Sequence, residues 1–139
     1  MSRVLTTFLV AVVLASFCGV RSFAADKIVF VAGKRSHGYG SHEHRAGCML
    51  LAKALNENVP GIEAVVTTEG WPANTDIFKD AKAVVVYCDG GGRHVLNKHL
   101  DYFDGLAKQK VGLVCLHYGV ETVKGKEGDS FIKWMGGYF

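Results

Sequence analysis

The stretch that decides the fold is VGLVCLHYG, residues 111–119. It begins with a continuous apolar run, which is typical of a strand buried on both faces. Cys115 and Gly119 then flank His117 with the small-x-centre-x-small spacing of a nucleophile elbow, a sharp turn from a strand into a helix. Bulky neighbours would clash in such a turn, and its central residue is normally a serine or a cysteine. The stretch therefore predicts an α/β sheet with a histidine where a nucleophile is expected.

The rest of the chain alternates between strand and helix patterns. Apolar runs predict strands at 27–33, 62–67, 83–88 and 111–116. Between them, helical spacing predicts a helix from about Ser41 to residue 58, a short helix at 76–79, and a helix marked by Leu96, Leu100, Phe103 and Ala107. Because the strands are apolar throughout, we expect a parallel sheet covered by helices on both faces. Such sheets carry their functional residues in the loops after the carboxyl ends of the strands, here 34–44, 89–94 and 117–130.

Residues 1–24 have the layout of a secretory signal peptide. Arg3 precedes an apolar stretch at 4–17, and a small-x-small cleavage pattern ends at Ala24. An uncleaved anchor is the alternative, although no long stop-transfer segment follows. Cleavage removes Arg3 and Arg21, which leaves 14 of the 16 basic residues against 13 acidic ones. We therefore expect an exported protein, periplasmic or extracellular, with no stable membrane span after cleavage and no nucleic-acid partner.

The first unusual loop is SHGYGSHEH, residues 36–44. Its histidines, His37, His42 and His44, are candidate ligands for a divalent metal such as zinc, because imidazole is the commonest metal ligand. His42 and His44 can share one ion only if the loop is still extended there, since in a helix they would point about 200° apart. The alternative is a polar loop in which Ser41 or His42 caps the helix. Any other cofactor is unknown.

The second loop is CDGGGRH, residues 88–94. Its glycines let backbone N–H groups approach a polar ligand, but it is neither GxGxxG nor a Walker motif. We therefore interpret it as a tight turn lining a cleft, with Asp89, Gly90 and Gly91 binding substrate. Asp89 would bind a sugar hydroxyl or orient a histidine. His94 and His99 are expected on the surface of the next helix.

The third loop begins at the elbow. His117 is a candidate general acid or base, and Glu121, four residues later, would share its helix face and orient the imidazole. Tyr118, beside it, is a candidate substrate contact. The alternative is a buried, satisfied His117 that ties loops together. Cys48, Cys88 and Cys115 match no zinc pattern and are expected in the core, so Cys115 should be unreactive.

Together, KIVFVAGKRSHGYGSHEHRAG (27–47), DGGGRH (89–94), GLVCLHYGVE (112–121) and GDSFIKWMGGYF (128–139) resemble the ThuA-like domain family of trehalose utilisation. The resemblance implies a class I glutamine amidotransferase-like fold, a flavodoxin-like three-layer sandwich, over residues 27–139. Amidotransferases carry a cysteine at the elbow, so His117 implies that glutamine hydrolysis by that route is absent. We expect residues 27–139 to be the N-terminal part of such a domain, because no finishing strand is apparent.

The resemblance implies carbohydrate metabolism of a trehalose or keto-glycoside type. The expected partner is a small-molecule carbohydrate, and the expected reaction class is a hydrolase, lyase or isomerase. One imidazole would move a proton while the others hold a metal or the sugar. The alternatives are a non-catalytic sugar-binding or interaction domain, in which Trp71 contacts ring faces, and an incomplete gene product with exposed sheet edges.

Overall fold

The structure is a computed structural model that describes residues 24–139. The predicted signal peptide lies outside these residues, apart from its last residue, Ala24. Within the described range, no helix combines the length and the apolar character needed to cross a membrane.

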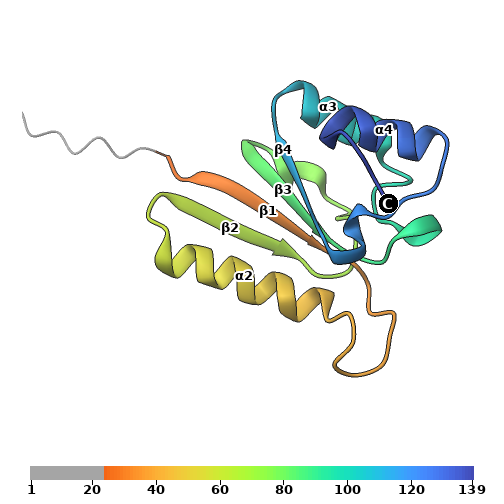
Figure 1. Cartoon of the computed structure of the whole chain (residues 1–139). Coiled ribbons are helices and arrows are strands. Elements are labelled where there is room, and N and C mark those ends of the chain that lie inside the picture. Colours follow the sequence, from red (N-terminus) through yellow and green to blue (C-terminus); the bar gives the residue numbers. More distant parts are fainter. Residues whose placement is uncertain (1–23) are drawn as a thin grey trace, which may run out of the picture.

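Four parallel strands form one sheet in the order β2-β1-β3-β4 (Figure 1). Their bounds are β1 Asp26–Ala32, β2 Ile62–Thr67, β3 Ala81–Tyr87 and β4 Gly112–Leu116. In the described part of the chain, three α-helices accompany them: α2 His44–Asn58, α3 Leu100–Lys108 and α4 Lys126–Met135. Short 3-10 helices stand in three connections: η1 Thr75–Phe78, η2 Gly91–Arg93 and η3 His117–Val120. This order and this layering confirm the predicted α/β flavodoxin-like fold.

Each inner strand buries side chains on both of its faces. Val29 and Val31 of β1 face the layer that contains α3 and α4, where Phe103 and Phe131 lie fully buried. The alternate residues of β1 face α2, and there they pack against its buried Cys48. Because successive side chains of a strand point to opposite faces, a strand covered on both sides must be apolar throughout. This explains the continuous apolar runs in the sequence.

The prediction that the first helix begins near Ser41 is wrong by about one turn. The helix begins at His44, because His42 takes a left-handed conformation with φ of 49° and its carbonyl accepts a hydrogen bond from the His44 N–H at 2.8 Å. The predicted cap by Ser41 or His42 is also wrong, since the cap position is Glu43 and no side chain there caps the helix. Likewise, α3 begins only at Leu100, and Leu96 lies buried in the turn before it.

Candidate functional site

The loops that follow β1 and β3 lie side by side at the carboxyl edge of the sheet. β1 and β3 are neighbours, and the Gly33 N–H extends their ladder by donating to the Tyr87 carbonyl at 2.8 Å. The chain order of the sheet reverses here, since β2 lies on the other side of β1. This topological switch point is where open α/β sheets bind their ligands.

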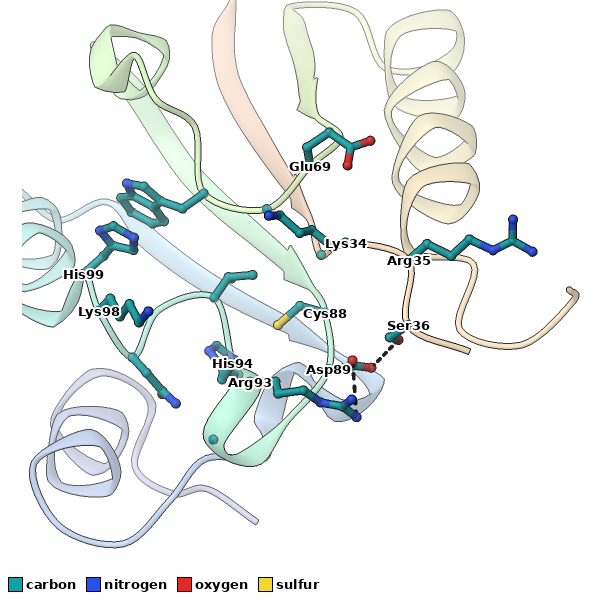
Figure 2. A pocket seen from close by; sticks show the side chains of 16 residues that line it. Lys34, Arg35, Ser36, Glu69, Cys88, Asp89, Arg93, His94, Lys98 and His99 are labelled. Carbon is teal, nitrogen blue, oxygen red and sulfur yellow. Dashed lines mark hydrogen bonds and ion pairs between the residues drawn. The ribbon is translucent and has the colours of Figure 1, made fainter. Parts of the chain in front are cut away.

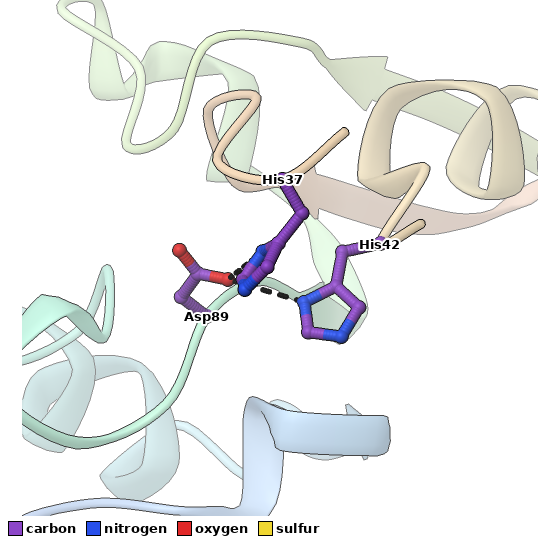
Figure 3. Close-up of side chains that lie close together, drawn as sticks. All are labelled: His37, His42 and Asp89. Atoms are coloured by element: carbon purple, nitrogen blue, oxygen red, sulfur yellow. Dashed lines mark ion pairs between the residues drawn. The ribbon is translucent and has the colours of Figure 1, made fainter. Parts of the chain in front are cut away.

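Asp89 is the centre of a cluster of three histidines at this edge. Its Oδ1 lies 3.5 Å from His42 Nδ1, 3.7 Å from His37 Nδ1 and 3.9 Å from His44 Nε2. Figure 3 shows His37 and His42 reaching the carboxylate from the loop after β1. We call these four residues the His–Asp cluster. His42 precedes α2, so the opposed directions that a helix would impose on His42 and His44 do not arise.

Hydrogen bonds determine which ring nitrogens carry protons. Ser36 donates its hydroxyl hydrogen to Asp89 Oδ1 at 2.8 Å, and Ser36 Oγ also lies 2.8 Å from His37 Nδ1. Since the hydroxyl has a single hydrogen, His37 Nδ1–H must donate to Ser36, which leaves the Nε2 lone pair free. His44 Nδ1 lies 3.2 Å from the Lys34 carbonyl, which can only accept, so His44 Nε2 also keeps a lone pair, facing Asp89.

His42 Nδ1 is buried and has no hydrogen-bond partner. Leaving such an atom unsatisfied costs about 1–3 kcal/mol, so it calls for an explanation. His37, His42 and Asp89 each offer a ligand atom, and these atoms lie within 4.8 Å of one another. Imidazole nitrogens with a carboxylate oxygen are donors that zinc accepts. The cluster therefore fits a divalent metal.

Asp89 is held as a carboxylate. Burial by itself raises the pKa of Asp89, but the hydrogen bond from Ser36, the contact with His42 and the charge of Arg93 outweigh it, and the net shift is downward. Arg93 approaches the second oxygen, Oδ2, at 3.5 Å. A negative charge is thus maintained beside three imidazoles.

The predicted elbow is present. His117 has φ of 54°, and η3 follows β4 directly. The need for a small residue at Gly119 is explained, because a Cβ there would lie 2.8 Å from the Val86 carbonyl oxygen. His117 itself is exposed, with its ring centroid 5.1 Å from that of His42 and 4.3 Å from that of Tyr118. Burial raises the pKa of Cys115 to about 12, as expected for an unreactive thiol.

The predicted helical pairing of His117 with Glu121 is wrong. η3 ends at Val120 and Glu121 is extended, so the two residues do not share a helix face. Glu121 instead packs on the glycine turn, where a Cβ at Gly90 would lie 2.5 Å from its Cβ and its Oε2. The Gly91 N–H donates to the Glu121 carbonyl at 3.1 Å. A glycine is therefore required at position 90, because Glu121, which follows the elbow, packs directly against it.

A hollow of about 530 Å³ opens over the His–Asp cluster. Its lining combines residues from all three predicted loops, His37, His42, Asp89, Gly90, Arg93, Tyr118 and Glu121, with the C-terminal residue Phe139. His44 lies on the buried side of the cluster, and His117 touches the lining through His42 and Tyr118. Sequence reasoning missed Ser36 and Arg93, although each lies within four residues of a residue that it did select.

His94 and His99 do not lie on a helix surface, and that expectation is wrong. His94 is buried, with Nε2–H donating to the Gly119 carbonyl at 2.9 Å and Nδ1 accepting from the Leu96 N–H at 3.1 Å. His94 therefore connects the glycine turn, residues 90–92, to the elbow that contains Gly119. His99 precedes α3 and stacks on Trp71, with centroids 4.5 Å apart and planes at 9°.

The His–Asp cluster and the neighbouring His117 together supply two kinds of chemistry. The nitrogen lone pairs and carboxylate oxygens of the cluster can hold a cation, and the exposed imidazole of His117, which lies against His42 and Tyr118, can exchange protons with a molecule that reaches it. Comparison of the chain with protein-family models, with curated proteins and with solved structures found no match.

Proposed function

We propose that this chain is a ThuA-like domain that processes a small carbohydrate at a divalent metal centre, with His37, His42 and Asp89 as ligands and His117 as the proton-transfer group. The observation that carries the proposal is the buried Nδ1 of His42, which makes no hydrogen bond and lies 3.5 Å from the ionised Asp89. A polar loop without a ligand gives no reason for that atom to be left unsatisfied. A bound cation does.

His44 supports the same proposal. Its Nδ1 is oriented by the backbone carbonyl of Lys34, and its Nε2 faces Asp89. A hydrogen bond from one ring nitrogen to a backbone carbonyl is the usual way in which proteins orient a metal-binding histidine. We therefore assign His44 as a fourth candidate ligand and zinc as the candidate ion.

The remaining roles follow from position. When bound, the metal would supply Lewis-acid polarisation of a substrate oxygen. His117 would give or take the proton at the reacting position, because its ring is exposed and lies against two residues that line the hollow. Glu121, Gly90 and Tyr118 line the hollow, and in this proposal they would contact sugar hydroxyls. Gly91 supports that wall through its hydrogen bond to Glu121.

The N-terminal sequence supports a proposal about location. Arg3, the apolar stretch at 4–17 and the cleavage pattern at Ala24 together form the layout of a secretory signal peptide. We propose that the chain is exported to a periplasmic or extracellular space.

The catalytic part is tested by turnover. The full chain is incubated with neutral sugars, trehalose and 3-ketotrehalose, and with anionic sugars, glucuronate and glucose 6-phosphate, and substrate loss is followed by NMR. His117→Asn is the informative variant, because asparagine tolerates a positive φ. It should lower kcat by about 100-fold or more while the metal content and Tm stay unchanged.

Two outcomes would contradict the proposal. Full turnover in His117→Asn would remove His117 from the mechanism. Sugar binding without any turnover in the wild type would favour the alternative, a non-catalytic sugar-binding domain.

A further inference from the structure

A second cavity, of about 750 Å³, adjoins the His–Asp cluster. Its lining includes Asp89 of the cluster and Ser36, which donates to Asp89, and it also includes Trp71 and His99. Figure 2 shows Asp89 and His99 at opposite ends of this lining. Its volume lies in the range of small-molecule sites. A molecule with one end at Asp89 would therefore place its other end in this cavity, which we call the basic cavity.

The basic cavity carries unbalanced positive charge. Four basic residues line it, Lys34, Arg35, Arg93 and Lys98, against two acidic ones, Glu69 and Asp89. Both acids already have a basic partner, since Asp89 lies 3.5 Å from Arg93 and Glu69 lies 3.9 Å from Arg45.

Two of the three remaining basic residues, Lys34 and Lys98, lie on opposite sides of the cavity. Within residues 24–139, no carboxylate oxygen lies within 4.0 Å of the charged groups of Lys34, Arg35 or Lys98. Figure 2 shows Arg35 pointing away, whereas Lys34 and Lys98 stand on opposite sides of the cavity. A concave site lined by one sign of charge attracts ligands of the other sign.

The far wall is aromatic. Trp71 and His99 stack face to face, and Trp71 also packs on Phe78 with centroids 4.8 Å apart. Burial and the charge of Lys98 both lower the pKa of His99, so the ring stays neutral beside the lysines. A fixed aromatic wall next to positive charges suits a molecule that has both an apolar face and a negative group.

We propose that the substrate of the metal centre is an anionic sugar, whose carboxylate or phosphate lies between Lys34 and Lys98 while its ring lies against the stacked pair of Trp71 and His99. This inference rests on the proposed function and narrows its substrate class. The two anions share one chemistry at this site, a negative oxygen group facing two ammonium groups.

The test is calorimetric titration of the full chain with glucuronate, with glucose 6-phosphate and with neutral glucose. Lys34→Met/Lys98→Met removes both charges and keeps similar side-chain length. Lys82→Met is the matched control, because Lys82 is exposed near the amino end of β3, whereas the basic cavity lies at the carboxyl ends of the strands. An exposed charge pair contributes up to about fivefold in affinity, so the double variant should bind the anionic sugar about 10- to 25-fold more weakly. Raising the salt from about 20 mM to about 200 mM should weaken binding to the wild type and have less effect on the double variant.

Tighter binding of glucose 6-phosphate would identify the anion as a phosphate, and tighter binding of glucuronate would identify a carboxylate; either supports the proposal. The proposal would be overturned if neutral glucose bound as tightly as glucuronate and glucose 6-phosphate, or if neither anionic sugar bound. It would also be overturned if the double variant and Lys82→Met bound the anionic sugar with equal affinity. The metal content of the double variant separates this result from the proposed function. If the double variant retains the metal and binds the anionic sugar as tightly as the wild type does, the proposed role of the basic cavity is refuted and the proposed metal centre is unaffected.

Discussion

Gly119→Ala tests the packing that positions the elbow. The new Cβ would lie 2.8 Å from the Val86 carbonyl oxygen and 3.6 Å from Cys115 Cβ. The oxygen belongs to the backbone of the central strand β3 and cannot move aside, so the elbow itself must shift. Overpacking of this kind costs about 1–3 kcal/mol. The shift also pulls the Gly119 carbonyl away from His94 Nε2, which adds about 1 kcal/mol.

We therefore expect Gly119→Ala to lower the free energy of unfolding by about 2–4 kcal/mol and Tm by about 10 °C. Gly105→Ala is the matched control. Gly105 lies inside α3 with nothing within 4 Å of a new Cβ, so the change should raise stability by about 0.5–1 kcal/mol. Urea denaturation followed by circular dichroism measures both. Equal stability of Gly119→Ala and the wild type would refute the close packing of the elbow on β3.

Two further predictions concern the core and its pH dependence. Phe131→Ala should destabilise by about 3–5 kcal/mol, because the ring is fully buried, whereas Ile132→Ala, next to it and 53% exposed, should cost less than about 1 kcal/mol; thermal melts compare the two. Burial lowers the pKa of His94 in the folded protein, although the hydrogen bond to the Gly119 carbonyl acts in the opposite direction. The neutral His94 therefore stabilises the fold at pH values above its unfolded pKa of about 6.5, and this stabilisation is lost as the pH falls below that value. The urea midpoint should therefore fall between about pH 8 and pH 5, and fall less in His94→Gln; an identical fall would contradict the neutral role of His94.

The layers of the fold were predictable because the strands carry their own signal. A strand segment buried on both faces must be apolar at every position, and residues 28–32 of β1 and 83–86 of β3 are. The elbow was also visible, since only a small residue fits at Gly119 against the Val86 carbonyl. The three loops 34–44, 89–94 and 117–130 were then expected near one another, because the carboxyl ends of parallel strands lie at the same edge of a sheet.

The details that were mispredicted depend on contacts between loops. The start of α2 is set by the left-handed backbone at His42, which no local propensity marks. The burial of His94 depends on the Gly119 carbonyl, 25 residues further along the chain. The central place of Asp89 among three histidines arises only when the loops after β1 and β3 come together.

The central claim is that the His–Asp cluster holds a divalent metal. The direct measurement is plasma mass spectrometry of the full chain after zinc loading and dialysis, for the wild type, His42→Ala and the control His99→Ala. We predict about one zinc per chain in the wild type and in His99→Ala, and almost none in a folded His42→Ala. A folded wild type without metal, or equal zinc in His42→Ala, would contradict the account.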